Sequence, residues 1–321
     1  MTERRGQSSF NDSNLLAALA CYPVDDDSYS RADGLALEEY HAFYGLNFVD
    51  AQSAMGIVGV DGERIAVQTF RPASGHNGHW ALVCHGYYDH AGLYGHLIQR
   101  LLDRGVGVLI FDHLGHGLST GQPATIDRFQ SYVDVLACIH RLCEDIIGCQ
   151  PKHWIGQSMG GAVLMEYEHQ RQLDPSGEFI LLAPLVRPYA WSLLQWYFAV
   201  IKRWITTRPR DMRSNMQTEF TEFLTRDPLQ AKILPVAWVQ AMVDWFTRFE
   251  TYPGSKVKAK IVQGFADKTV SYRHDLPILD RRYQSASVLT IPAARHHLVN
   301  ETEPVRQQLW DWLDITCEWR H

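Results

Sequence analysis

Apolar residues in the middle of the chain fall into short unbroken runs separated by stretches of helical periodicity. Trp80–Cys84 and Val106–Phe111 are continuous apolar runs, typical of strands that are buried on both faces. Residues 132–146 instead carry apolar side chains at steps of 4, 3, 4 and 3, which predicts an amphipathic helix. Leu97, Leu101 and Leu102 predict another helix between the two runs. Strands that alternate with crossover helices indicate a mostly parallel sheet covered by helices on both faces.

The pattern before and after these runs extends the same α/β arrangement. Gly56–Val60 and Arg64–Phe70, joined by a turn at Asp61 and Gly62, predict a hairpin. Further strands are predicted at His153–Ile155, Phe179–Ala183, Ala259–Val262 and Ser287–Ile291. Residues 1–13 are expected to be frayed, and residues 34–46 have the spacing of a short helix. We therefore expect an N-terminal extension over residues 1–55, ahead of the sheet domain.

The strand and helix alternation stops between residues 185 and 253. This segment holds five of the ten tryptophans and is broken by Pro209, Pro228 and Pro235, which favours several helices. We expect it to be a helical cap inserted into the sheet domain. The core would then consist of residues 56–184 and 254–321.

Composition narrows the class of protein. A chain of 321 residues with 46% hydrophobic residues can bury a large core without disulfides or metals, and its net charge of -6 argues against a nucleic-acid partner. The polar N-terminus lacks the apolar region of a signal peptide, and no stretch is long and apolar enough to span a membrane. The six cysteines are scattered, as expected for reduced thiols. These features predict a cytoplasmic protein.

Two pentapeptides have the pattern G-x-S-x-G, but only one has the context of a nucleophile. Gly117–Gly121 opens into a loop, so Ser119 is expected to be a loop residue. Gly156–Gly160 follows a predicted strand and runs directly into a predicted helix. A sharp turn between strand and helix lifts a serine hydroxyl above the edge of the sheet, and small residues let the helix pass close to the strand. Ser158 is therefore the nucleophile candidate.

A serine nucleophile needs an imidazole base, and the base needs a carboxylate to orient it. Asp267 follows the strand ending near Gln263, and His296 and His297 follow the strand Ser287–Ile291. Functional groups in parallel sheets gather beyond these carboxyl ends. Asp267 is favoured over Asp275 and Asp280, which lie farther from a strand end. The choice between the two histidines stays open on physical grounds alone.

Two backbone N–H groups should face the oxyanion that develops during attack on a carbonyl. One is expected from Met159, which follows the nucleophile, and the other from Tyr87 in the turn after Trp80–Cys84. Asp112 ends a strand but precedes the nucleophile, so we expect it to cap a loop. The fifteen histidines show no metal-ligand spacing, and no glycine-rich cofactor motif is present. We expect neither a metal nor a cofactor.

Six segments together resemble the lysophospholipase and monoacylglycerol lipase branch of the α/β-hydrolase fold. They are His85–His90, Phe111–Gly121, Gly156–Gly161, Leu181–Pro184, Gln263–Asp267 and Ala294–Glu301. The resemblance covers about residues 56–313 and implies a serine hydrolase with its catalytic histidine at the first of the two adjacent histidines, His296. The chain departs from the family pattern at His297, where an acid is common, and at the aromatic residues Tyr87 and Tyr88.

The resemblance implies hydrolysis of a carboxylic ester, of lysophospholipid or monoacylglycerol type, through an acyl-enzyme on Ser158. One alternative is an aminopeptidase of the same fold, with Glu219, Glu222 or Glu250 holding the free amine. A non-catalytic binding module is the other.

The predicted cap has a net charge of +4 over residues 195–213, where tryptophans interleave with lysine and arginine. This pattern fits peripheral contact with a membrane or with anionic headgroups. It fits equally a helix that packs its aromatic residues inward while the basic ones face water. The oligomeric state is left open by the sequence.

Overall fold

A nine-stranded sheet forms the centre of the computed structural model, which describes residues 10, 12–33, 35, 37–171, 173, 177–210 and 218–319. Its order in this part of the chain is β1-β2-β3-β5-β4-β6-β7-β10-β11. The strands from β5 to β11 in that order are parallel, whereas β1, β2 and β3 pair antiparallel. The strands are β1 (Tyr29–Arg31), β2 (Ala51–Val60), β3 (Glu63–Pro72), β4 (Trp80–Cys84), β5 (Gly107–Phe111), β6 (His153–Gln157), β7 (Phe179–Leu182), β10 (Ala259–Gly264) and β11 (Ser287–Ile291). The predicted mostly parallel sheet is confirmed.

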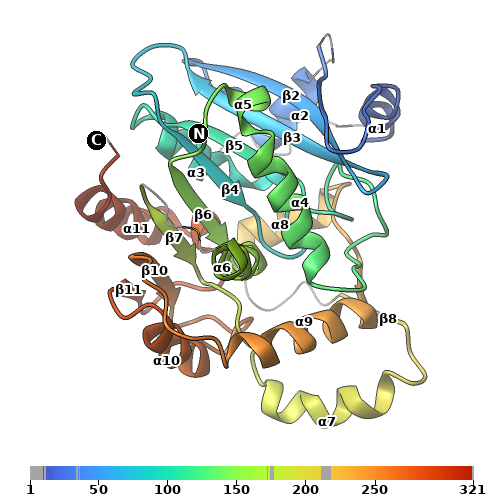
Figure 1. The fold of residues 1–321 in the computed structure, drawn as a ribbon, viewed down its shortest axis with the longest axis vertical. Helices are drawn as coiled ribbons and strands as arrows, with labels where there is room; N and C mark the ends of the chain where they lie inside the picture. The colour runs from blue at the N-terminus through green and yellow to red at the C-terminus, as the bar shows by residue number, and fades with distance from the viewer. Residues whose placement is uncertain are drawn as a thin grey trace.

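Helices cover both faces of this sheet, with α4 and α6 on one face and α3 and α11 on the other (Figure 1). The helices outside residues 185–253 are α1 (Asp12–Ala20), α2 (Glu38–Tyr44), α3 (Gly95–Leu102), α4 (Gln130–Arg141), α5 (Cys143–Ile147), α6 (Met159–Arg171), α10 (Tyr272–Arg282) and α11 (Glu303–Thr316). Short 3₁₀ turns lie at Ala91–Tyr94 and Leu298–Asn300.

Two hydrophobic clusters fill the space between the sheet and its helices. Successive residues of a strand point to opposite faces. Accordingly Ala81 and Val83 of β4 belong to the cluster under α3 and α11, while Leu82 and Cys84 belong to the cluster under α4 and α6. All four side chains are fully buried. This explains why a strand without alternating polar residues is stable only at the centre of such a sheet.

The N-terminal region differs from the sequence prediction. The hairpin begins at Ala51 and not at Gly56, and β1 adds an edge strand that was not predicted. The segment predicted to be frayed, residues 1–13, overlaps α1, which begins at Asp12 and buries Leu15 and Leu19 in the core. Residues 1–9 and 11 lie outside the described residues. The helix predicted over 34–46 is α2, and positions 34 and 36 are also not described.

The helix predicted over residues 132–146 is divided in two. α4 ends at Arg141 and α5 begins at Cys143, because Leu142 between them leaves helical geometry at φ -89° and ψ 4°. The apolar spacing continues through this break because Ile139 and Cys143 still face the same cluster. Periodicity alone therefore does not reveal the interruption.

Residues 185–253, here called the insert, lie between β7 and β10. They form α7 (Trp191–Ile201), β8 (Thr207–Pro209), α8 (Thr218–Arg226), β9 (Ile233–Pro235) and α9 (Val236–Phe249). β8 and β9 pair as a small antiparallel ribbon, so the expectation of helices alone was incomplete, and Pro209 and Pro235 end strands. α9 lies between α7 and the sheet (Figure 1). The predicted domain limits stay a prediction.

Candidate active site

Ser158 lies on a strained turn between β6 and α6. Its φ of 52° is left-handed, a conformation that is rare for residues other than glycine. The turn is tight enough that a Cβ atom on Gly160 would lie 2.1 Å from the carbonyl oxygen of Cys84. A Cβ atom on Gly156 would lie 2.7 Å from Gly160 and Gly161. The small residues of the pentapeptide are therefore required for α6 to pass close to β4 and β6.

A hydrogen-bonded chain joins the three predicted side chains. His296 Nε2 lies 2.8 Å from Ser158 Oγ, and His296 Nδ1 lies 2.7 Å from Asp267 Oδ2. Asp267 and His296 occupy the loops after β10 and β11, at the same edge of the sheet as the turn that carries Ser158, here called the elbow. All three side chains are buried. The structure thus brings together residues that are 29 and 138 positions apart in the sequence.

The surroundings of this chain favour a charged Asp267 beside a basic His296. Burial raises the pKa of Asp267. His296 and the backbone N–H groups of Thr269 and Val270 together lower it by more, so the net pKa is below the ordinary value. Burial lowers the pKa of His296, but Asp267 raises it above its ordinary value. The imidazole can therefore accept a proton from the serine hydroxyl more readily than an isolated histidine would.

The two predicted oxyanion donors flank Ser158. Met159 is the first residue of α6, where backbone N–H groups have no acceptor within the helix. Tyr87 lies in a turn over residues 86–89, closed by a hydrogen bond of 3.1 Å from the Asp89 N–H to the Gly86 carbonyl. A Cβ atom on Gly86 would lie 3.4 Å from Ser158 Cβ, so this turn lies directly beside Ser158. We call residues 86–89 the oxyanion turn.

The competing sequence candidates are used elsewhere in the fold. Asp275 accepts hydrogen bonds from the backbone N–H groups of Val186 and Arg187, and Asp280 is exposed. Ser119 donates to the Asp112 carbonyl oxygen at 2.6 Å and accepts from the Ala66 N–H at 2.9 Å. Asp275, in the first turn of α10, and Ser119, in a loop, are thus engaged in other contacts and not in the hydrogen-bonded chain of Ser158.

The prediction that Asp112 caps a loop is confirmed. Its carboxylate accepts from the N–H groups of Ala91 at 2.7 Å and Leu118 at 2.8 Å. His297, the other histidine candidate, lies with its Nε2 2.9 Å from Asp89 Oδ2 and does not contact Ser158 Oγ in the described hydrogen bonds.

Several supporting residues were missed by the sequence reasoning. Gln157 Nε2 donates to the His296 carbonyl oxygen at 2.9 Å, and Gln263 Nε2 donates to Asp267 Oδ2 at 3.1 Å. Tyr94 accepts from the Gly86 N–H and donates to Asp89, both at 2.9 Å. Gln157 and Gln263 lie at or next to the carboxyl ends of β6 and β10. This position is the one sequence signal that could have indicated their supporting role.

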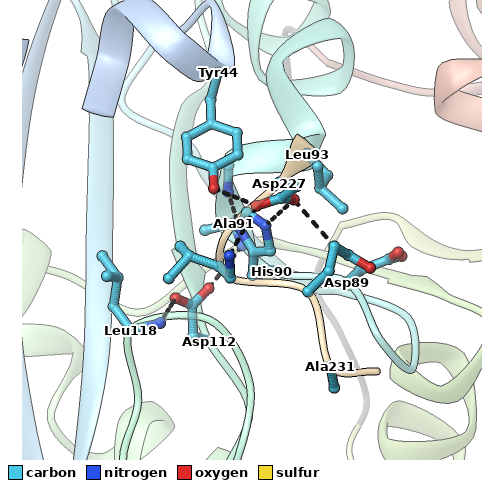
Figure 2. A network of polar contacts seen from close by, with 12 residues as sticks. Tyr44, Asp89, His90, Ala91, Leu93, Asp112, Leu118, Asp227 and Ala231 are labelled. Atoms are coloured by element: carbon cyan, nitrogen blue, oxygen red, sulfur yellow. Dashed lines mark hydrogen bonds and ion pairs between the residues drawn. The ribbon is translucent and has the colours of Figure 1, made fainter. Parts of the chain in front are cut away.

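A buried ionic contact ties the insert to the core beside this site (Figure 2). Asp227, which follows α8, lies with Oδ2 2.9 Å from His90 Nε2, and both side chains are fully buried. Tyr44 donates its hydroxyl to Asp227 Oδ1 at 2.6 Å. Burial raises the pKa of Asp227, but His90 and the hydrogen bonds from Tyr44 and the Leu229 N–H together lower it, and the net pKa is below the ordinary value. This contact fixes the middle of the insert, just after α8, on the loop that follows the oxyanion turn.

Neither a candidate metal site nor a membrane-spanning helix is found in the part of the chain that the structure describes. Among the described residues, no three histidine, cysteine, aspartate or glutamate side chains are grouped so that they could hold a metal ion. In the same part of the chain, every helix is too short or too polar to cross a bilayer.

Comparison with known proteins defines the family. A family model described as serine aminopeptidase, S33, matches residues 77–303, which include Ser158, Asp267 and His296. The chain belongs to this family. The resemblance to the α/β-hydrolase fold that the sequence suggested is thereby confirmed.

Curated relatives and solved structures add more specific likenesses. A monoacylglycerol lipase of Mycolicibacterium smegmatis is 30% identical over 116 residues, 36% of this chain, and this chain spans only 41% of that protein. Human monoglyceride lipase is 25% identical over 77% of this chain and 84% of its own length. A soluble variant of monoglyceride lipase from Saccharomyces cerevisiae has a TM-score of 0.69 at 16% identity, covering 84% of this chain and 98% of that chain. The structural likeness supports the α/β-hydrolase fold.

Proposed function

We propose that this protein is a serine hydrolase of carboxylic esters and that its substrates are lipid esters of monoacylglycerol or lysophospholipid type. The observation that carries the proposal is the hydrogen-bonded chain from Asp267 through His296 to Ser158 on a strained elbow. Relatives named monoacylglycerol and monoglyceride lipase support the ester class. No cofactor is needed for this chemistry.

The proposed reaction uses a covalent acyl-enzyme. Ser158 Oγ attacks the ester carbonyl while His296 Nε2 takes the hydroxyl proton, and the N–H groups of Tyr87 and Met159 stabilise the oxyanion. Collapse of the tetrahedral intermediate breaks the bond to the alcohol, which leaves with the proton from His296. Water then attacks the acyl-serine, gives its proton to His296, and the acid is released as Ser158 regains its hydrogen. Asp267 orients the imidazole and stabilises its cation throughout.

Labelling by a fluorophosphonate probe tests the nucleophile. We expect the wild type to be labelled and Ser158→Ala to be inert, with Ser119→Ala as the matched control because it alters the other G-x-S-x-G. Labelling that survives in Ser158→Ala, or that is lost only in a folded Ser119→Ala, would contradict the assignment. Thermal unfolding of each variant establishes that it is folded.

The family description makes an aminopeptidase the second candidate. Such an enzyme needs an acidic group for the free amine, but Glu250 is already paired with Arg187 and His274. Glu219 and Glu222 are exposed on α8. Hydrolysis of p-nitrophenyl esters of increasing chain length, compared with aminoacyl p-nitroanilides, separates the two. Faster turnover of the anilides would overturn the ester proposal, and a folded protein that turns over neither would favour a binding module.

We also propose that the insert acts as the cap over the site and that its outer helix contacts an anionic lipid bilayer. Leu193 and Trp196 of α7 are 79% and 76% exposed, and Trp204 beyond it is 85% exposed. Residues 191–209 contain three basic residues, Lys202, Arg203 and Arg208, and no acidic one. A surface that is both apolar and basic fits the boundary between acyl chains and anionic headgroups.

Vesicle flotation tests this contact. We expect the wild type to float with vesicles containing phosphatidylglycerol and to float less with phosphatidylcholine alone. Replacing Trp196 and Trp204 together by serine should abolish flotation, while activity on a short soluble ester stays unchanged. Equal flotation of wild type and double variant would contradict the proposed surface.

A further inference from the structure

The oxyanion turn is held in a conformation that its sequence disfavours. Tyr88 has a φ of 69°, at the third position of a turn where glycine or asparagine is usual. A bulky residue in this region is strained and persists only where its surroundings hold it. The N–H of the neighbouring Tyr87 is the proposed oxyanion donor, so whatever holds the turn also aims that donor.

The core holds the two ends of the turn. Gly86 donates its N–H to the Tyr94 hydroxyl at 2.9 Å, and that hydroxyl donates to Asp89 Oδ2 at 2.9 Å. His297 Nε2 lies 2.9 Å from the same carboxylate oxygen. These contacts involve only the first and last residues of the turn. The Tyr87 hydroxyl also donates to the Ala124 carbonyl oxygen of the core at 2.8 Å, which leaves the face of the Tyr87 ring and the Tyr88 side chain, at the centre of the turn, to be held from another side.

Two side chains of the insert contact these central residues. Trp238, near the start of α9, stacks on Tyr87 with ring centroids 3.6 Å apart and planes 15° from parallel. The Arg210 guanidinium lies 4.0 Å from the centre of the Tyr88 ring, a cation–π contact. Arg210 follows β8 and is itself held by its hydrogen bond to Gln230 Oε1. Successive residues of the turn are therefore both held by the insert.

We propose that Trp238 and Arg210 are positioning residues, which hold the Tyr87 N–H toward the oxyanion only while the insert is docked on the core. This inference rests on the proposed function, because it concerns the oxyanion of that reaction. Movement of the insert to admit a substrate would release the strained turn, and its return would restore the donor before attack. Binding and catalysis are thereby coupled, as in induced fit.

The tryptophan contact is tested by kinetics on a small ester. Loss of a whole oxyanion donor costs about 10²–10³ in kcat, so a displaced donor should cost somewhat less. We expect Trp238→Leu to lower kcat for p-nitrophenyl acetate roughly 10- to 100-fold while KM changes less than about twofold. Trp238→Phe keeps a ring against Tyr87 and should retain most of the activity.

Trp191→Leu is the matched control. Trp191 is also a buried tryptophan of the insert, but its ring contacts are Phe198 and Phe246 and not the oxyanion turn. It should lower the melting temperature comparably and leave kcat nearly unchanged. An equal loss of kcat in Trp191→Leu, or a Trp238→Phe variant as impaired as Trp238→Leu, would overturn the inference.

A boronic acid inhibitor gives a second readout because its tetrahedral adduct with the serine occupies the oxyanion site. We expect its affinity to fall in Trp238→Leu by the same factor as kcat/KM. Arg210→Met removes the charge over Tyr88 from a half-buried position, so it keeps the test valid if Trp238→Leu does not fold. It should lower both quantities about 3- to 10-fold, less than loss of a full donor.

Failure of this inference differs from failure of the proposed function. A wild type that neither turns over the ester nor reacts with a fluorophosphonate contradicts the proposed function itself. An active wild type whose Trp238→Leu and Arg210→Met variants are equally active, and equally inhibited by the boronic acid, overturns only the role of the insert.

Discussion

Two helices of the insert, α7 and α9, are similar in sequence character and opposite in environment. Both are rich in apolar residues and both carry two tryptophans. In α9, Trp238 and Trp245 are 7% and 0% exposed, whereas Trp196 of α7 is 76% exposed. Figure 1 shows the reason, because α9 lies against the core and α7 lies on its far side.

The difference shows that partners decide what an apolar helix does. Trp245 stacks between Phe129 and Phe249 and donates its Nε1–H to Glu166 Oε2 at 2.8 Å. The outer face of α7 keeps large apolar side chains in contact with solvent, an arrangement that marks an interaction surface when it is contiguous. The insert thus has an inner layer that packs on the core and an outer layer for which we propose contact with lipid.

The variant with the largest expected effect on stability is Trp245→Ala. Truncating a fully buried tryptophan leaves a cavity and should lower the free energy of unfolding by about 3–5 kcal/mol. Removal of the indole also takes one hydrogen-bond donor from buried Glu166. Urea denaturation measures the change. A loss below about 1 kcal/mol would mean that α9 is not part of the core as the structure shows it.

The buried contact of Asp227 with His90 should be the next in size. Asp227→Asn keeps the shape and an acceptor for Tyr44 but removes the charge that faces His90, so we expect a loss of about 1–3 kcal/mol in unfolding free energy. Glu219→Gln, on the exposed face of the preceding helix, is the control and should change stability by less than about 0.5 kcal/mol. Equal effects of both changes would show that the contact does not anchor the insert.

The same contact gives stability a defined pH dependence. Burial lowers the pKa of His90, but Asp227, with smaller contributions from Asp112 and Asp89, raises it to a net value above the ordinary one. A raised pKa stabilises the fold fully below the unfolded value of about 6.5, and this contribution is lost as pH rises through the folded value. Each unit of difference corresponds to about 1.4 kcal/mol.

His90→Gln should remove this dependence. The difference in unfolding free energy between wild type and His90→Gln is therefore expected to be largest below pH 6.5 and to shrink toward alkaline pH. Denaturant titrations at a series of pH values measure it. A difference that grows with pH would reverse the sign and contradict a charged His90 in the folded protein.

The smallest expected effect is that of Trp196→Ala. Trp196 is largely exposed, and an exposed side chain contributes little to stability, so the unfolding free energy should stay within about 0.5 kcal/mol of wild type. The same measurement as for Trp245→Ala makes the comparison direct. A loss as large as that of Trp245→Ala would mean that the outer face of α7 is covered in solution.

The sequence was sufficient to predict the sheet, and to place Ser158, Asp267 and the two histidines at one edge of it, because both depend on local patterns. Continuous apolar runs such as Trp80–Cys84 can be satisfied only at the centre of a covered sheet. The elbow at Ser158 needs small residues on either side, and the loops of Asp267 and His296 follow directly from strand ends. The resemblance was needed to choose between the adjacent histidines, because nothing local distinguishes them.

What could not be predicted depends on contacts between distant residues. The short strand β1 exists because it pairs with β2, and the ribbon of β8 and β9 because its two strands meet across α8. The contacts of Trp238 with Tyr87 and of Arg210 with Tyr88 join positions that no spacing rule relates. Hydrophobicity gave α7 and α9 the same description, because it does not record what each helix faces.

The left-handed backbone of Ser158 has a consequence for how such a protein could change over time. Glycine adopts this conformation without strain, so a Ser158→Gly protein would lose the proposed nucleophile while relieving part of the backbone strain. Most random substitutions destabilise a protein, but this one would stabilise the fold. An inactive descendant of this chain could thus be more stable than its active ancestor. Stable folding of a relative would therefore say nothing about whether that relative still turns over a substrate.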